Sequence, residues 1–260
     1  DVYKNWRNTI VNTRSFGSEA DKVIDNARAY IKGVKAANPN MACTAKHFPG
    51  DGVEELDQHL VMGVNNLSVD EWEESFGKVY RTLIDEGLET IMVGHIALPE
   101  MSRKLVPGIE DKDIKPATLS KELLTDLLRE DMNFNGLVIT DASHMVGMSA
   151  TSKRCDAVPG AIIAGCDMFL FANDIAEDMA YVRKAYEDGL LTEERLEEAV
   201  RRILGMKAHL NLTDESVIIP DKKELDNIGC DAHRECAKKA ADECITLVTV
   251  SYTHLTLPTT

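Results

Sequence analysis

The sequence lacks an excess of positive charge, and this lack excludes whole classes of partner. Lysine and arginine number 29 against 44 aspartate and glutamate residues, which gives a formal net charge of −15. A nucleic-acid-binding surface needs a basic patch, and an anionic membrane surface repels an acidic protein. We therefore expect neither nucleic acid nor a membrane surface as a partner.

The sequence also lacks long apolar runs and closely paired cysteines. No apolar run approaches the roughly 20 residues that a membrane-spanning helix needs. The six cysteines show no Cys-x-x-Cys or other zinc-ligand spacing, so we expect free thiols and no metal or other cofactor. Free thiols favour a reducing compartment, and the cytoplasm is the expected location. The chain starts on Asp1 without a methionine, which leaves a preceding secretory signal open.

Short apolar runs alternate with amphipathic stretches along most of the chain. The apolar runs predict strands at residues 41–45, 90–94, 136–140 and 168–172. The amphipathic stretches predict helices at residues 18–34, 68–86, 120–128, 157–164, 175–187 and 192–207, and capping boxes at Ser18 and Ser68 open the first two. A loop of about twenty residues rich in proline and charge is expected after the second strand. This alternation is typical of βαβ units, so the expected class is α/β with a parallel sheet.

Polar side chains stand at the ends of three predicted strands. Lys46 and His47 follow the first strand, His95 the second and Asp141 the third. The carboxyl ends of parallel strands meet at one face of a sheet or barrel, so we expect a single site there. Two alternatives remain open, because His95 also fits a hydrogen-bonded core histidine and Asp141 also fits a carboxylate that caps a helix or orders a loop.

An acidic loop after a Pro-Gly-Asp-Gly turn carries Asp57 and His59, one residue apart. A carboxylate on one nitrogen of a histidine fixes its tautomer and raises the basicity of the other nitrogen. The pair therefore suits acid–base chemistry near neutral pH. An incidental histidine on a solvated acidic loop is one alternative, and a metal site formed with His47 and Asp51 is another.

Three of these stretches together resemble the family 3 glycoside hydrolases. They are Lys-His-Phe-Pro-Gly from Lys46, the Asp57-x-His59 loop, and the segment 116–145, which contains Val-Ile-Thr-Asp-Ala. The resemblance is strongest to the β-N-acetylglucosaminidase (β-N-acetylhexosaminidase) branch, which carries a His-Asp dyad on a mobile loop. It runs in order from about residue 1 to residue 249.

The resemblance implies a domain organisation. Residues 1–209 would form a (β/α)8 TIM-type barrel lacking its first strands, and residues 210–230 a linker. Residues 231–249 would start a truncated α/β sandwich domain. The Thr-rich residues 250–260 match nothing in the family and resemble the translation of a sequencing adapter, so we expect a non-native tail there.

The resemblance also implies an activity, the release of terminal β-linked N-acetylglucosamine from peptidoglycan or chitin fragments with retention. Asp141 would be the nucleophile that forms a covalent glycosyl-enzyme, and His59 with Asp57 the acid/base. An imidazole in this role avoids a second negative charge beside the nucleophile. The partner would be a small-molecule carbohydrate, and the oligomeric state stays open. The residues expected to contact the sugar are Arg14, Lys46 and His47.

Other activities stay open beside this one. Within the family they are β-glucosidase, β-xylosidase and a phosphorolytic reaction, in which the imidazole repels phosphate less than a carboxylate would. Outside it, a metal-dependent hydrolase and a non-catalytic sugar-binding remnant are the alternatives, and Arg14 alone also fits a surface salt bridge. One departure from the family pattern is Asp51, which stands where a histidine is common and which we expect to help position the dyad loop.

Overall fold

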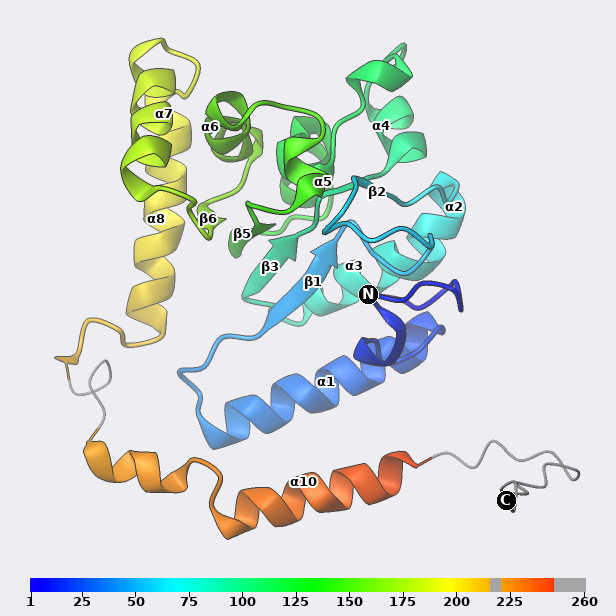
Figure 1. Ribbon diagram of the computed structural model, residues 1–260, viewed down its shortest axis with the longest axis vertical. Coiled ribbons are helices and arrows are strands. Elements are labelled where there is room, and N and C mark those ends of the chain that lie inside the picture. Colours follow the sequence, from blue (N-terminus) through cyan, green and yellow to red (C-terminus); the bar gives the residue numbers. More distant parts are fainter. Residues whose placement is uncertain (216–220, 246–260) are drawn as a thin grey trace, which may run out of the picture. The chain divides into compact units, whose positions relative to one another are not determined.

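A parallel sheet organises the first 211 residues of the structure, a computed structural model that describes residues 1–215 and 221–245 (Figure 1). Its strands, in the order β1-β3-β5-β6, are β1 (Thr44–Phe48), β3 (Thr90–Val93), β5 (Leu137–Ala142) and β6 (Met168–Leu170). All three neighbouring pairs are parallel. Strands that follow one another both in the chain and across the sheet, with helices between them, are the β/α units of a (β/α)8 barrel, so the predicted fold class is confirmed.

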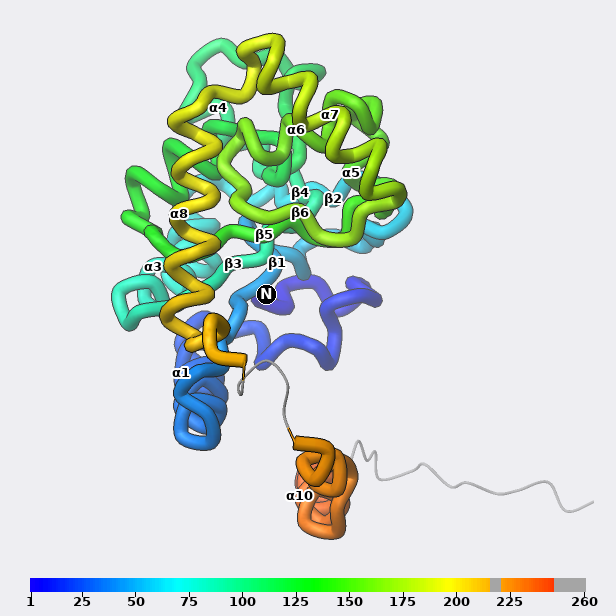
Figure 2. Tube along the Cα trace, turned by 90° about the vertical axis from the view of Figure 1, so that its left-hand side faces the viewer, coloured from blue at the N-terminus to red at the C-terminus, as the bar shows by residue number. Residues whose placement is uncertain are grey.

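Helices surround this sheet. Seen from the side, β1, β3, β5 and β6 lie in the middle, with α1, α3 and α8 at the periphery (Figure 2). The α-helices of the described chain are α1 (Ala20–Ala37), α2 (Val69–Trp72), α3 (Lys78–Asp85), α4 (Pro99–Leu105), α5 (Val146–Ser149), α6 (Arg154–Ala164), α7 (Ile175–Glu187), α8 (Glu193–His209) and α10 (Asp231–Cys244). The π-helical segments are Glu73–Gly77 and Glu122–Asp131, and the 3₁₀ turns are Asn12–Arg14, Asp111–Asp113, Ala117–Leu119 and Lys222–Asn227.

The two predicted capping boxes have different outcomes. Ser68 caps α2 through the Glu71 backbone N–H, and the Glu71 carboxylate accepts from the Ser68 backbone, as predicted. The prediction at Ser18 was wrong, because α1 begins at Ala20 with Glu19 as its N-cap and no side-chain cap. The Ser18 hydroxyl donates to the adjacent Glu19 carboxylate instead, so it does not reach the helix backbone.

Strand β1 starts three residues later than predicted. It spans Thr44–Phe48, so Lys46 and His47 belong to the strand and do not follow it. Pairing with β3 decides this, since Phe48 is still in register with Val93. Within the strand, His47 and Phe48 are buried and Lys46 is exposed.

The predicted long loop after β3 was also wrong, because it contains regular structure. Residues Ile96–Ala97 form β4, which pairs in parallel with β2 (Gly63–Val64), and Pro99 then starts α4 at its first turn. Proline at that position lacks only an N–H that has no partner inside the helix. The two-stranded β2–β4 sheet ties the stretch that follows the acidic loop to the stretch after β3.

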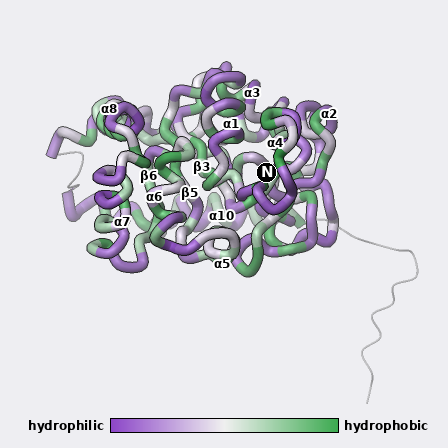
Figure 3. Tube along the Cα trace, turned by 90° about the horizontal axis from the view of Figure 1, so that it is seen from above, coloured by the Kyte–Doolittle hydropathy of each residue, from purple (hydrophilic) through white to green (hydrophobic). Residues whose placement is uncertain are grey.

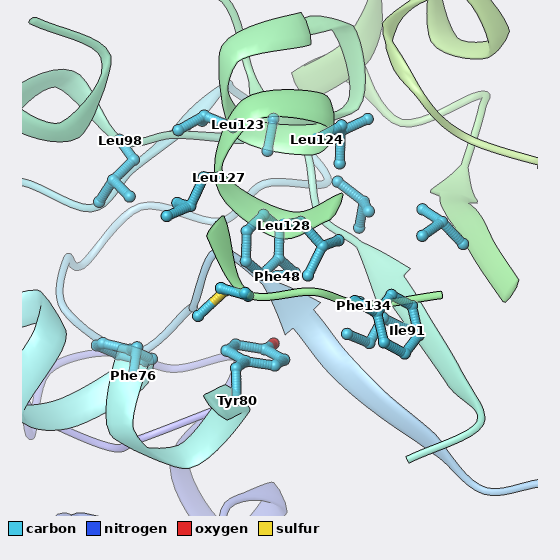
Figure 4. Packing of buried hydrophobic residues seen from close by; sticks show 14 of the residues in the cluster. Phe48, Phe76, Tyr80, Ile91, Leu98, Leu123, Leu124, Leu127, Leu128 and Phe134 are labelled. Atoms are coloured by element: carbon cyan, nitrogen blue, oxygen red, sulfur yellow. The ribbon is translucent and has the colours of Figure 1, made fainter. Parts of the chain in front are cut away.

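The hydrophobic core lies between the sheet and its helices. Leu123, Leu124, Leu127 and Leu128 are each at most 2% exposed and lie over the strands that carry Phe48 and Ile91 (Figure 4). Hydrophobic residues accordingly gather around β3 and β6, whereas hydrophilic residues dominate the periphery (Figure 3). The inner face predicted for the helix after Ser68 is confirmed, because Trp72, Phe76, Val79, Tyr80 and Leu83 are all buried.

The Pro-Gly-Asp-Gly turn after β1 packs directly on this core. Gly50 has φ +135°, and a Cβ atom there would lie 2.1 Å from the Phe76 ring. The Trp72 indole N–H donates to the Pro49 carbonyl at 2.9 Å. The start of the acidic loop is therefore fixed by the core, and only glycine fits at position 50.

The chain divides into two compact units, Asp1–Asn211 and Leu212–Thr260. The described part of the second unit contains a 3₁₀ turn and α10. The end of the expected second-domain segment, residues 246–249, and the expected tail at 250–260 fall outside the described residues, so the predicted division at 209, 230 and 249 stays a prediction. Within residues 1–215 and 221–245, no helix combines the length and apolarity needed to cross a bilayer.

Candidate active site

Asp141 lies at the carboxyl end of β5, as predicted. Its Oδ1 accepts the Ala142 backbone N–H at 2.7 Å, which orients the carboxylate. Its Oδ2 lies 3.6 Å from Nε2 of His47, and the two side chains are 13% and 5% exposed. Strands β1 and β5, which lie on either side of β3, thus bring together two of the predicted site residues across 94 positions of sequence.

Asp1 holds His47 in place. The Asp1 carboxylate accepts the His47 backbone N–H at 2.8 Å and lies 2.9 Å from its Nδ1. Burial lowers the pKa of His47 to about 4, so the ring is neutral at pH 7. An ionised carboxylate only accepts, so the single ring proton is on Nδ1 and Nε2 presents a lone pair toward Asp141. In this form His47 can accept a hydrogen bond from a hydroxyl group at Nε2, and its contact with a sugar stays a prediction.

Asp57 and His59 form the predicted pair on the acidic loop. His59 Nδ1 lies 2.6 Å from Asp57 Oδ1, and the same oxygen accepts the His59 backbone N–H at 2.9 Å. The His59 side chain is 51% exposed, against 24% for Asp57. With Nδ1 bonded to the carboxylate, Nε2 is the nitrogen available for proton transfer.

The acidic loop is joined to the segment that follows Asp141. The Val146 N–H donates to the His59 carbonyl at 3.1 Å, and the Gly147 N–H donates to the Gln58 carbonyl at 3.2 Å. A Cβ atom at position 147 would lie 2.6 Å from that Gln58 carbonyl, so the close approach requires glycine. The first turn of α5 thus places the Asp57–His59 pair beside the end of β5.

Arg14 and Lys46 lie together at the rim of a cavity of about 330 Å³ that Asp1 also lines. Both side chains are exposed, and the Arg14 guanidinium donates to the Ile10 carbonyl at 3.2 Å. Apolar residues of α1 and α3 form part of the cavity wall, and neither His59 nor Asp141 is among its lining residues. We therefore place the candidate site at the strand ends and not in this cavity. Contact of Arg14 and Lys46 with a sugar stays a prediction.

His95 is a buried, hydrogen-bonded histidine, which was one of the two interpretations of its place in the sequence. It is 0% exposed, and its ring nitrogens lie 2.9 Å from the Thr118 hydroxyl and 3.0 Å from the Ala142 carbonyl. Burial lowers the pKa of His95, which favours the neutral ring. Through Ala142, His95 supports the strand end that carries Asp141.

The four side chains of the metal-ligand alternative are engaged in separate contacts. His47 faces Asp1 and Asp141, and Asp57 bonds to His59. Asp51 accepts hydrogen bonds from other side chains, described below. Over residues 1–215 and 221–245, no three His, Cys, Asp or Glu side chains are grouped so that they could hold a metal ion.

Sequence reasoning missed three contributors to the site, namely Asp1, Gln58 and Thr118. Asp1 is the first residue of the sequence, and its partner His47 is 46 residues away. Gln58 and Thr118 have no local signal. Their partners are 37 and 23 residues away in sequence, so only the folded chain brings them together.

Known proteins resemble this chain over most of its length. The model of the glycosyl hydrolase family 3 N-terminal domain matches residues 1–206. A beta-N-acetylglucosaminidase/beta-glucosidase of Cellulomonas fimi is 47% identical over 248 residues, which cover 95% of this chain and 43% of that protein. A beta-hexosaminidase of Psychromonas ingrahamii is 33% identical over 171 residues, or 65% of this chain and 47% of that protein.

Solved structures show the same likeness. The beta-glucoside phosphorylase BglX bound to 2FGlc superposes with a TM-score of 0.92 at 43% identity, over 98% of this chain and 45% of that one. A family 3 beta-N-acetylglucosaminidase from Paenibacillus sp. str. FPU-7 gives a TM-score of 0.74 at 27% identity, over 82% and 39%. The chain thus spans less than half the length of these four relatives.

Proposed function

The chain belongs to glycosyl hydrolase family 3, and on that premise we propose that it holds the catalytic residues of a retaining exo-acting glycosidase. The substrate is a peptidoglycan or chitin fragment with a terminal β-linked N-acetylglucosamine. The observation that carries the proposal is the placement of the exposed His59–Asp57 pair beside the end of β5, where Asp141 lies. A nucleophilic carboxylate and a separate proton-transfer group are what double displacement requires.

The proposed reaction has two steps. First, the Asp141 carboxylate attacks the anomeric carbon while protonated His59 gives its Nε2 proton to the departing glycosidic oxygen. The bond between the anomeric carbon and that oxygen breaks, and an ester to Asp141 forms. Second, water attacks the anomeric carbon, neutral His59 takes a proton from it, and Asp141 leaves as a carboxylate.

The names of the relatives support two sugars. The relative from Cellulomonas fimi is named for both N-acetylglucosamine and glucose, and the one from Psychromonas ingrahamii for hexosamine. N-acetylglucosamine derives from a hexosamine, so both names are compatible with it as the substrate. Activity on β-glucosides is the alternative within the same mechanism.

Phosphorolysis is a second candidate, and the likeness to a beta-glucoside phosphorylase favours it. In this variant, inorganic phosphate replaces water in the second step and a sugar 1-phosphate leaves. After the first step His59 is neutral, so it does not repel the phosphate anion as a carboxylate acid/base would.

The test measures 4-nitrophenol release from the β-N-acetylglucosaminide and the β-glucoside, with and without inorganic phosphate. We expect turnover of the first substrate, with free N-acetylglucosamine as the product. A sugar 1-phosphate formed only when phosphate is present would identify the phosphorolytic variant. Binding of N-acetylglucosamine without any turnover would instead support a non-catalytic sugar-binding protein.

Covalent trapping tests the nucleophile directly. A 2-deoxy-2-fluoro-β-glucosyl fluoride slows both steps, but its good leaving group lets the first proceed, so the glycosyl-enzyme accumulates. We expect intact-protein mass spectrometry to show one added fluorosugar, with peptide mapping placing it on Asp141. Labelling of any other carboxylate would overturn the assignment.

A further inference from the structure

Gln58 is a buried amide in the middle of the Asp57-Gln58-His59 stretch. It is 1% exposed, although His59 beside it is exposed. Its Nε2 donates to Asp51 Oδ2 at 3.0 Å, and its Oε1 accepts the His95 backbone N–H at 3.0 Å. One side chain thus links the acidic loop to the turn after β1 and to the end of β3.

The orientation of this amide follows from its partners. The backbone N–H of His95 can only donate, so it must face the amide oxygen. An ionised carboxylate can only accept, so Asp51 must face the NH₂ group. Both ends of Gln58 are therefore matched in one arrangement only.

Asp51 is itself part of a buried network. It is 6% exposed, and its Oδ1 accepts the Gly52 N–H at 2.6 Å and the Asn8 Nδ2 group at 3.2 Å. Asn8 is 0% exposed and also donates to the Glu54 carbonyl at 2.7 Å. The network holds the acidic loop at Asp51, Glu54 and Gln58 before it reaches His59.

We propose that Asp51 and Gln58 form a clamp that fixes the acidic loop at the strand ends, with His59 already in place for proton transfer before substrate binds. Both are positioning residues, since neither reaches the reacting atoms. The clamp itself follows from the contacts above, whereas its effect on catalysis rests on the proposed function. It also accounts for the departure at position 51, because a carboxylate there needs a donor and Gln58 supplies it.

Exchanging the two groups tests the clamp. In Asp51→Asn, the NH₂ group of Gln58 faces the NH₂ group of the new amide, so neither can accept a hydrogen bond. In Gln58→Glu, two carboxylates lie about 3 Å apart, and their like charges repel. In the double variant Asp51→Asn/Gln58→Glu, the new amide donates and the new carboxylate accepts. The carboxylate also accepts the His95 N–H as Gln58 does, so both hydrogen bonds return, and only the one between positions 51 and 58 has its polarity reversed. Asn66→Asp, on an exposed residue of the next stretch, is the control for adding a carboxylate.

The first readout is amide hydrogen exchange of the peptide that spans residues 51–64, in the full chain. We expect each single variant to exchange about 10- to 100-fold faster, because a buried polar group loses its partner. The double variant should return most of that protection, and Asn66→Asp should match the wild type. Equal loss in the double variant, with no coupling between the two sites, would overturn the proposal.

Gln58 also offers a direct probe, because it is the one glutamine in the 260-residue sequence. Selective ¹⁵N-glutamine labelling therefore gives a single side-chain NH₂ pair in the NMR spectrum. We expect this pair to exchange slowly with solvent in the wild type and rapidly in Asp51→Asn. Rapid exchange in the wild type would contradict a closed clamp, whatever the enzyme activity.

The kinetic readout separates positioning from general stability. Each single variant should lower kcat about 10-fold or more with little change in KM, since His59 is displaced while the sugar contacts remain. Gln58→Glu should regain activity as the pH falls, because the paired carboxylates then share a proton and restore the bond. The titratable groups around this pair are Asp1, His47, Glu54 and His95. If the wild type showed no turnover, the proposed function would be refuted. The exchange of the backbone amides and of the Gln58 side-chain NH₂ would still test the clamp, because neither measurement depends on activity.

Discussion

Two aspartates at opposite ends of the same sheet have opposite surroundings. Asp167 precedes the first residue of β6, and its side chain is 0% exposed. Its carboxylate lies 2.6 Å from Arg129 and 2.8 Å from Arg195, with Arg202 at 3.4 Å. Burial lowers the pKa of Arg129 to about 10, which still leaves it charged at pH 7. Asp167 is thus neutralised by guanidinium groups on all sides.

Asp141 at the other end faces an imidazole that carries no charge at pH 7. Its partner His47 has a pKa of about 4, and the two are 3.6 Å apart. A carboxylate held without a guanidinium partner keeps its lone pairs available for a reacting atom. The comparison indicates that one end of the sheet uses its buried charge for stability and the other for chemistry, which is the usual division in barrels of this kind.

Of the variants considered, Asp141→Asn should lower the activity most. It changes the end of the sheet that we assign to catalysis, called the chemical end below. The amide cannot form the glycosyl ester, so kcat/KM for the 4-nitrophenyl substrate should fall at least about 10⁴-fold. The size of the side chain is unchanged, so the thermal midpoint should move little. A variant that keeps wild-type turnover would refute the nucleophile assignment.

Asp167→Asn is the matched substitution at the other end, and it should have the reverse profile. Three arginines would lose their buried counter-charge, and removal of one partner from a buried ion pair costs about 3–5 kcal/mol. Urea unfolding should show this loss, while the folded fraction keeps its kcat/KM. Loss of activity in fully folded protein would contradict the comparison.

His59→Ala should lower activity by about 10²-fold or more on substrates whose leaving group needs a proton. The loss should be far smaller with 2,4-dinitrophenyl glycosides, because that leaving group departs without protonation. Stability should change little, since the side chain is 51% exposed. A loss of equal size on both substrates would show that His59 does not act as the acid.

The sequence indicated the parts of this comparison that are local in the chain. Asp141 follows an apolar run, and Asp57 and His59 stand one residue apart, so local spacing made them candidates, whereas their proposed roles came from the family resemblance. Asp167 could not be recognised, because its arginines come from positions 129, 195 and 202 and meet only after folding. The start of β1 was misplaced for a similar reason, since pairing with β3 sets the strand bounds and hydrophobicity alone does not.

His47, at the chemical end of the sheet, should also make the free energy of unfolding depend on pH. The pKa of His47 is about 4 in the folded chain, below the ordinary value of 6.5, so between these values the unfolded chain binds more protons. The free energy of unfolding should therefore fall as the pH drops from 6.5 to 4, by at most about 1.4 kcal/mol per pH unit from this group. Urea titrations of the wild type and His47→Asn should differ in this window, with the flatter curve in the variant. Parallel curves would mean that the ring is not buried in its neutral form.

Glu54 should give the opposite slope and the smallest effect. Burial, aided by the charge of Asp51, raises the pKa of this carboxyl from 4.5 to about 7, although the hydrogen bond from the Val64 N–H acts to lower it. The folded chain therefore binds more protons between these values, and this contribution to stability is lost as the pH rises through 7. Glu54 is only half-buried, so solvent screening keeps the effect below that of His47. Glu54→Gln keeps an oxygen for the Val64 N–H and should flatten the unfolding free energy between pH 4.5 and 7. If the unfolding free energy of Glu54→Gln kept the wild-type slope against pH, another group would be the source of the pH dependence. If the His47 and Glu54 variants remove slopes of opposite sign, both titrating groups lie at the chemical end of the sheet.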